Sequence, residues 1–167
     1  MSMSDQHPTL YPTRIDLAAD IRLDVITRLN QTLACTVDLR SQVKHACWNV
    51  KGKDLVPLQT LFTTIATELD GYADVLAERI AVLGGVVTGT IRTVALQSSL
   101  PEYPETLVAG DAHVAALAER FAYYATVMRS GITLAADVED AGSAALYTDI
   151  SRGVDKRLWV LEAYLHR

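Results

Sequence analysis

Four stretches of the chain repeat apolar residues at spacings of three and four, the period of an amphipathic α-helix. The first runs from about Leu17 to Trp48 and stops before Gly52. The second follows Asp54, a candidate N-cap, and stops at Gly84-Gly85. The apolar positions of the third and fourth are Val114, Leu117, Phe121, Tyr124, Met128 and Ile132, then Leu146, Ile150, Val154, Leu158, Leu161 and Leu165. The pattern predicts an all-α chain with four long helices.

Two segments lack this period. Residues 1–15, rich in Pro, Ser and Thr, are expected to form a flexible N-terminal arm, which leaves residues 16–167 as the folded domain. Residues 85–106 form a connection that is long for a bundle, where roughly two to eight residues suffice. The connection should therefore cross the length of the bundle between the second and third helices. This topology is the ferritin-like four-helix bundle, a fold that often carries carboxylate metal sites.

Composition and charge limit the possible partners. The chain has 167 residues, half of them hydrophobic, which suits one compact domain. Twenty acidic and fifteen basic residues give a net charge of -5, so the average field repels DNA and anionic lipid. No apolar run approaches the roughly 18–20 residues of a membrane span, and residues 1–14 lack the apolar core of a signal peptide. We therefore expect a cytoplasmic protein without a membrane segment.

The second helix carries the clearest candidate chemistry. Asp74 and Glu78 lie one turn apart, on the side that faces away from the apolar stripe. They are either part of a solvated surface or ligands of a hard divalent cation that bind once another chain covers them. The residues alone leave both interpretations open.

The stretch KHACWNVKG places His45 and Cys47 two positions apart near the end of the first helix. Two positions are a rotation of about 200°, so the two side chains point in nearly opposite directions and cannot ligate one ion unless the helix has ended. His45 is expected to be a surface or interface histidine. Cys47 is either a small buried hydrophobe or a metal ligand.

Three motifs resemble those of the Dps miniferritins, the DNA-binding proteins from starved cells: KHACWNVKG, D-x-x-AER-x-x-x-LGG and DK-x-LW. The likeness runs from about Leu10 to the C-terminus. Dps proteins form hollow dodecamers that bind Fe(II) between two-fold-related subunits, oxidise it, preferentially with hydrogen peroxide, and store ferric mineral; many also bind DNA. The resemblance therefore implies a homo-oligomer, a ferroxidase activity and iron as the metal.

The resemblance also implies a ligand set, of which this chain keeps one half. In the family, two carboxylates from D-x-x-AER of one subunit meet two histidines and an aspartate of the other, in the patterns HWNV and LH-x-x-F-D. Asp74 and Glu78 match the first half, whereas Cys47, Gln59 and Thr63 replace the three ligands of the second half. A thiol and neutral groups suit iron less well than imidazole and carboxylate, so we expect impaired ferroxidase activity. Zinc held by Cys47, Asp74 and Glu78 is the alternative.

A second acidic group corresponds to the pore-lining stretch of the family. It consists of Asp137, Glu139, Asp140 and Asp149. These residues are expected either to attract Fe(II) and nucleate mineral or to be solvated residues at a helix start. Ala145 stands where many members carry a pore aspartate.

DNA binding is expected to be weak or absent. Many members use lysine-rich tails, but Arg14 is the one fixed basic residue of the N-terminal arm. Twelve copies of a chain of charge -5 carry about -60. The leading hypothesis is thus a Dps-like shell that stores iron, oxidises it with impaired activity, and protects the cell and its DNA from peroxide and iron stress. A catalytically inactive structural or metal-sequestering cage is the alternative, and DNA coating ranks last.

Overall fold

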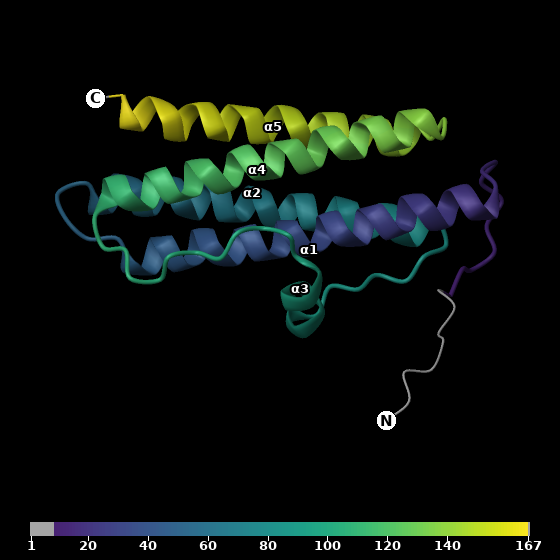
Figure 1. Ribbon diagram of the computed structural model, residues 1–167, viewed down its shortest axis with the longest axis horizontal. Coiled ribbons are helices and arrows are strands. Elements are labelled where there is room, and N and C mark those ends of the chain that lie inside the picture. Colours follow the sequence, from purple (N-terminus) through teal and green to yellow (C-terminus); the bar gives the residue numbers. More distant parts are fainter. Residues whose placement is uncertain (1–8, 167) are drawn as a thin grey trace.

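The computed structural model describes residues 9–166 and shows an all-helical bundle (Figure 1). Four long helices lie along one axis: α1 (Ala19–Asn49), α2 (Leu55–Val82), α4 (Gly110–Asp137) and α5 (Ala141–Leu165). α1 and α2 form one antiparallel hairpin, and α4 and α5 form the other. The expected all-α, ferritin-like bundle is confirmed.

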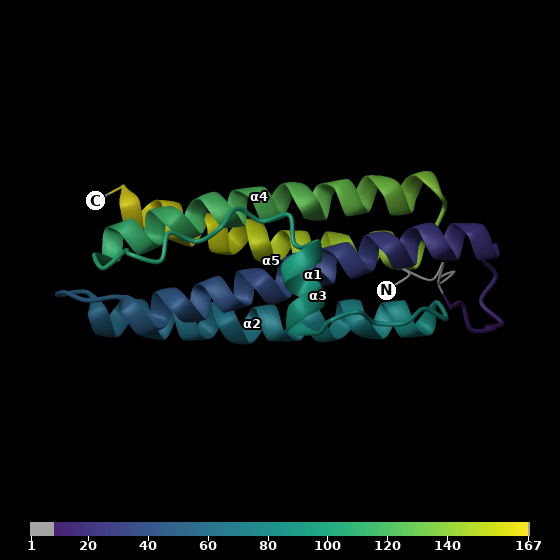
Figure 2. The ribbon, with the colours of Figure 1, turned by 60° about the horizontal axis from the view of Figure 1, so that its bottom comes forward.

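The connection between α2 and α4 runs the length of the bundle, as expected, because both helices point in the same direction (Figures 1 and 2). The sequence pattern missed the short helix α3 (Ile91–Gln97) within this connection. Of its large apolar side chains, Ile91 and Leu96 are exposed and only Val94 is buried, so this one-turn contact does not form the repeated apolar stripe by which the long helices are recognised.

The apolar stripes of the long helices meet in one core. Its largest fully buried side chains come from all four long helices and include Leu29, Leu39, Phe62, Ile65, Leu76, Phe121, Tyr124 and Tyr147. Burial of this apolar surface is the main force that holds the helices together. Among the described helices, none is both long enough and apolar enough to cross a bilayer.

α2 begins after Asp54 and ends before Gly84, as the sequence predicted, although Asp54 does not act as a capping residue. Gly84 ends the helix with a φ of 86°, and the Gly85 amide donates to the Ile80 carbonyl at 2.9 Å, as in a glycine C-cap. Asp54 stands at the N-cap position, but its side chain makes no capping hydrogen bond. Its Oδ2 instead accepts a hydrogen bond from the Tyr164 hydroxyl of α5 at 2.9 Å.

The described part of the N-terminal arm lies against the bundle, in contrast to the flexible arm expected from composition. Leu10 and Ile15 pack on the core, and the Tyr11 amide donates to the Gly84 carbonyl at 2.7 Å. Arg22 of α1 donates to the carbonyls of Leu83 and Tyr11 at 2.9 and 3.3 Å. These contacts hold residues 10–15 at the end of α2. Residues 1–8 of the expected arm lie outside the described part of the chain.

Candidate metal centre

Asp74 and Glu78 lie on the outward face of α2, as the helical period predicted. Both side chains are exposed, and within residues 9–166 neither forms an ion pair. Asp70, one turn earlier, differs because Arg40 of α1 lies 3.0 Å from its carboxylate. Asp74 and Glu78 therefore present two uncompensated carboxylates to whatever covers this face.

Cys47, Gln59 and Thr63 come together where the last turns of α1 meet the first turns of α2. The Cys47 Sγ lies 3.6 Å from the Thr63 hydroxyl and 3.8 Å from the backbone carbonyl oxygen of Gln59. The side-chain amide of Gln59 donates a hydrogen bond to the backbone carbonyl of Cys47 at 3.3 Å. Cys47 is 7% exposed, whereas Gln59 and Thr63 are exposed. We call these three residues the α1–α2 cluster; its members contact one another and carry no imidazole or carboxylate.

His45 does not join this cluster. α1 continues without a break to Asn49, so the opposite orientation of His45 and Cys47 expected from the helix is confirmed. The His45 ring lies edge-on to the Tyr103 ring at a centroid distance of 5.3 Å. The imidazole and the thiol therefore face different surroundings and cannot bind one ion.

The two candidate groups on α2 are far apart within one chain. Thr63 and Asp74 are eleven residues apart on one helix, which corresponds to about 16 Å. Accordingly, the described residues contain no group of three or more His, Cys, Asp or Glu side chains placed to hold a metal ion. A centre that combines the two groups requires a second chain.

The interior of the bundle offers no substitute site. At its centre the Thr36 and Tyr124 hydroxyls lie 2.6 Å apart, and the Thr32 and Tyr147 hydroxyls lie 3.0 Å apart. Burial raises the pKa of Tyr147 to about 12 and also raises the pKa of Tyr124, so both phenols stay protonated. Asp140 is the one buried carboxylate among residues 9–166, and it lies at the end of the bundle.

Asp140 corrects one expectation about the acidic group. Its carboxylate is 2% exposed and caps α5 by accepting from the Ser143 amide at 3.0 Å. Arg79 donates to the same oxygen at 2.7 Å, and the Ser143 hydroxyl donates to the other oxygen at 2.5 Å. Asp140 is therefore neither solvated nor free to line a pore. The arginine of the D-x-x-AER motif anchors α2 to the start of α5, a role that the sequence pattern did not reveal.

The other members of the acidic group are exposed. Asp137 and Glu139 have no ion pair within the described residues, while Asp149 pairs with Arg152 one turn away at 3.1 Å. Their role at a pore stays a prediction.

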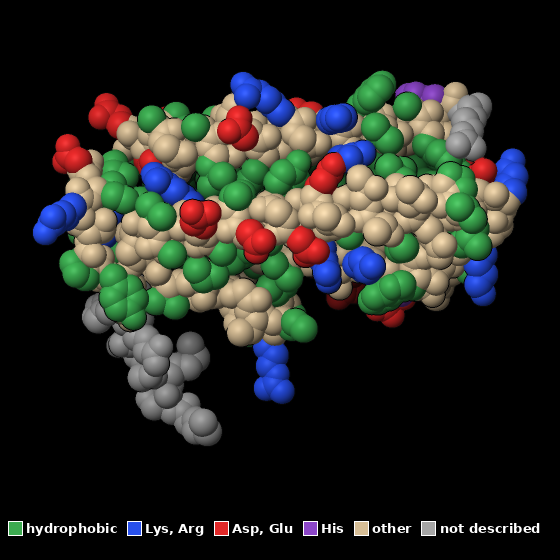
Figure 3. Space-filling view, turned by 180° about the vertical axis from the view of Figure 1, so that it is seen from behind, with side chains coloured by type: hydrophobic (Ala, Val, Ile, Leu, Met, Phe, Trp, Pro, Cys, Tyr) green, Lys and Arg blue, Asp and Glu red, His purple; other side chains and the backbone are tan. Residues whose placement is uncertain are grey.

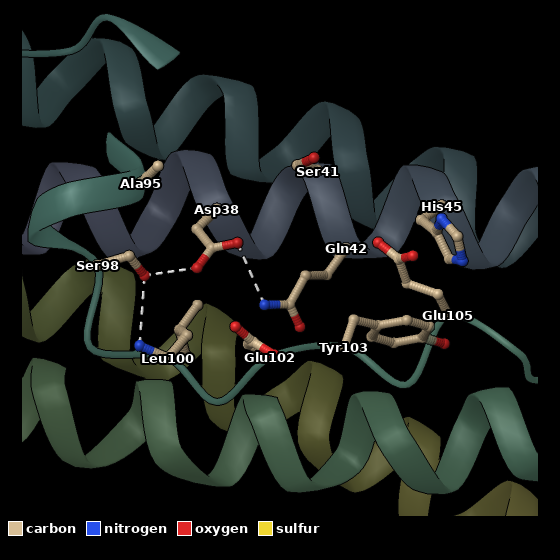
Figure 4. Close-up of a pocket in the computed structure, with 10 residues that line it drawn as sticks. All are labelled: Asp38, Ser41, Gln42, His45, Ala95, Ser98, Leu100, Glu102, Tyr103 and Glu105. Carbon is tan, nitrogen blue, oxygen red and sulfur yellow. Dashed lines mark hydrogen bonds between the residues drawn. The ribbon is translucent and has the colours of Figure 1, made fainter. Parts of the chain in front are cut away.

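A polar cavity of about 730 Å³ lies between α1 and the connection, on the side of α1 that carries His45 (Figure 4). Its lining includes Asp38, His45, Glu102, Tyr103 and Glu105. The Ser98 hydroxyl donates to Asp38 at 2.5 Å and ties the end of α3 to α1. The connection has no helical period, so the sequence offered no signal that placed these residues together.

Comparison with known proteins decides the family. A model of the ferritin-like domain matches residues 26–167. A DNA protection during starvation protein of Agrobacterium fabrum (strain C58) is 35% identical over 155 residues, which cover 93% of this chain and 96% of that protein. The chain belongs to the Dps family.

Solved Dps structures share the fold over nearly the whole chain. DpsC from Streptomyces coelicolor matches with a TM-score of 0.90 at 25% identity, covering 98% of this chain and 96% of that one. The Dps protein of Vibrio cholerae O1, described as a member of a broad superfamily of ferritin-like diiron-carboxylate proteins, matches with a TM-score of 0.87 at 25% identity, covering 95% and 99%. Membership in the Dps family implies iron as the metal. The backbone of the family is retained in this chain, and the α1–α2 cluster differs from the family only in its side chains.

Proposed function

We propose that this Dps-family protein assembles into a hollow cytoplasmic shell, a dodecamer of identical chains, that stores iron and oxidises it slowly. In this way it protects the cell and its DNA from iron and peroxide stress. One observation carries the proposal: the outward face of α2 bears unpaired carboxylates at one end and the neutral α1–α2 cluster at the other. Each end is an incomplete site, and a second copy of the same face completes both.

Gly71 supports a close contact between two copies of α2. It is exposed in the middle of the helix, and a Cβ added there would meet no atom within 4 Å. A glycine inside a helix costs about 1 kcal/mol relative to alanine, and packing within this chain does not account for it. A helix of a second chain that crosses closely at this point does, because glycine lets two backbones approach.

The same contact gives a register. If two α2 helices cross antiparallel at Gly71, Asp74 comes within a turn of Thr67 of the other copy, and Glu78 comes within a turn of Thr63. The acidic end of each helix then faces the neutral end of its neighbour. Two such sites arise per pair, and each joins two carboxylates from one chain to the α1–α2 cluster of the other.

The side chains at this site support slow oxidation. Two carboxylates are suitable ligands for Fe(II), but the facing thiol, hydroxyl and amide bring no negative carboxylate and no imidazole. Loss of one supporting group around a metal typically lowers affinity about 10–100-fold, so three exchanged ligands should lower it at least as much. Zinc is the alternative occupant, since it accepts sulfur as well as oxygen ligands.

The chief alternative is a cage that sequesters metal without turnover. The hydrogen bonds within the α1–α2 cluster favour it, because a metal that used these groups would first have to break them. In that case Asp137, Glu139 and Asp149 would be the main cation-attracting groups.

DNA coating has the least support. On the described part of the face in Figure 3, acidic side chains are interspersed with Lys and Arg and no continuous basic surface forms. Together with the net charge of -5, this mixed surface favours weak or absent binding at physiological salt.

Stopped-flow oxidation of Fe(II) by hydrogen peroxide tests the proposal. The assembled protein is compared with an Asp74→Ala/Glu78→Ala variant and with a charge-matched Asp24→Ala/Glu162→Ala control, whose exposed acids lie elsewhere. We expect slow oxidation in the wild type and the control, and still slower oxidation in the first variant. Equal rates in all three, at the uncatalysed background, would establish the inactive cage instead.

A further inference from the structure

A second cavity, of about 410 Å³, lies between α1 and α4, next to the end of α3 (Figure 2). Most of its lining side chains carry neutral polar groups, and the one charged residue among them is Arg28 of α1. None of the described residues that line it is acidic. We call it the Arg28 cavity, because it presents a single positive charge among neutral groups.

Arg28 lacks the compensation that the other sheltered arginines have. Four described arginines that are not exposed pair with a carboxylate: Arg40, Arg79, Arg120 and Arg157. Arg22 donates instead to two backbone carbonyls. Within residues 9–166, Arg28 forms no ion pair, and its one hydrogen-bond partner is the neutral Ser130 hydroxyl of α4, at 3.2 Å. A partly buried cation is costly without a partner of opposite charge, so an anion at Arg28 would be stabilising.

The charge of Arg28 acts toward the interior of the bundle. Burial raises the pKa of the Tyr147 phenol to about 12, while its hydrogen bond with Thr32 and the charge of Arg28 act in the opposite direction. An anion beside Arg28 would therefore meet a charge that is less screened than one on the open surface. Asp24 and Asp137 line an adjoining cavity together with Arg28, but in the described structure neither pairs with it and neither lines the Arg28 cavity.

Several further donors line the same cavity. The Tyr123 hydroxyl of α4 and the Gln31 side chain of α1 have no hydrogen-bond partner among residues 9–166. The Gln97 side-chain oxygen accepts from the Thr88 hydroxyl at 3.4 Å, which leaves its amide nitrogen available to donate. A carboxylate offers two oxygens, whereas a phosphate group offers three or four. Donors on three separate segments together with a guanidinium fork therefore suit a phosphate group best.

We propose that the Arg28 cavity binds a phosphate group, either inorganic phosphate or a small phosphomonoester, with Arg28 as the anchor and Gln31, Gln97 and Tyr123 as neutral donors. Arginine stays protonated throughout the physiological range of pH, and its planar fork matches two phosphate oxygens. The volume is that of a small-molecule site and is too small for a nucleic-acid duplex. The site is separate from Asp74, Glu78 and the α1–α2 cluster, so the proposal does not depend on iron chemistry.

Isothermal titration of the metal-free assembled protein with inorganic phosphate, in a buffer without phosphate or sulfate, tests the site. We expect saturable binding with one site per chain. Arg28→Gln should weaken binding at least about tenfold, because hydrogen bonds to a charged group are lost. Arg92→Gln is the matched control: Arg92 is exposed on α3 and has no ion pair among the described residues, so this variant should bind as the wild type does.

A second titration, with glycerol 3-phosphate, distinguishes the two sources of the phosphate group. Tighter binding than that of inorganic phosphate identifies a phosphomonoester site, and equal or weaker binding identifies a site for inorganic phosphate. Acetate is the probe for a carboxylate and should bind at least about tenfold more weakly. Acetate that binds as tightly as phosphate would overturn the assignment to phosphate.

Lack of saturable phosphate binding in the wild type, or equal binding in wild type and Arg28→Gln, would overturn the proposal. If Arg28→Gln does not fold, Gln31→Ala/Tyr123→Phe decides. Both side chains are exposed, so the fold should tolerate their change, and Arg28 keeps its charge. Phosphate affinity should fall about tenfold in this variant, and unchanged affinity would rule out the Arg28 cavity as the site.

Discussion

The Cys47 sulfur lies 3.6 Å from the Thr63 hydroxyl, across the junction of α1 and α2. In the Dps pattern both positions belong to metal ligands, and in this chain they contact each other. A thiol is a weak donor and a weak acceptor, so the contact adds little stability by itself. Nevertheless, a metal that bound the Cys47 thiol or the Thr63 hydroxyl would have to displace this contact. The difference from the family therefore lies in the side chains and not in the backbone.

Restoring the family ligands should therefore restore activity. In a Cys47→His/Gln59→His/Thr63→Asp variant we expect Fe(II) oxidation by peroxide to rise at least about tenfold, since imidazole and carboxylate ligands replace neutral groups. Stopped-flow absorbance measures the rate. Adding Asp74→Ala to this triple variant should abolish the gain. If the gain survives that addition, Asp74 is not part of the centre.

The proposed crossing at Gly71 predicts a selective effect on assembly. A Gly71→Leu chain should keep its helical circular dichroism, because the position is open within one chain, but should lose the higher assembly in analytical ultracentrifugation. Ala163→Leu, at an exposed position of α5, is the control and should assemble normally. Normal assembly of Gly71→Leu would place the contact between copies elsewhere on the surface.

The buried pair of Arg79 and Asp140 predicts a loss of stability. In Asp140→Asn an oxygen can still cap α5, but the Arg79 charge loses its partner in a largely buried setting. Breaking such a pair costs about 3 kcal/mol or more in the free energy of unfolding. Denaturant unfolding measures it. The exposed pair of Arg152 and Asp149 is the comparison, since Arg152→Ala should change stability by less than about 1 kcal/mol.

Charge predicts the behaviour toward DNA. In a gel-shift assay we expect no complex at about 0.15 M salt, because a shell of net negative subunits repels phosphate and exposed charges are screened beyond roughly 8 Å at that salt. Any complex at low salt should disappear as salt rises. A shift that persists at 0.15 M would contradict the low rank of DNA coating.

The segments that the sequence did not predict are held by contacts that do not repeat along the chain. α3 and residues 98–108 are held by single buried apolar side chains, Val94 and Leu100, and by polar contacts such as Ser98 to Asp38, none of which follows a helical period. The same holds for residues 10–15, whose backbone hydrogen bond to Gly84 is invisible in a composition rich in Pro and Thr. The fate of Asp140 was also hidden, because the cap of α5 and the approach of Arg79 depend on how two hairpins pack.

The sequence by itself determined the four long helices, the outward direction of Asp74 and Glu78, and the opposite directions of His45 and Cys47. These properties follow from the 3.6-residue period and from burial of one apolar stripe per helix, both of which are local. Only the tertiary structure decided that Cys47, Gln59 and Thr63 close on one another, that Asp140 is taken up by Arg79, and that Tyr103 meets His113. Each of these contacts joins separate segments of the chain, and such distances are set by the packing of whole helices.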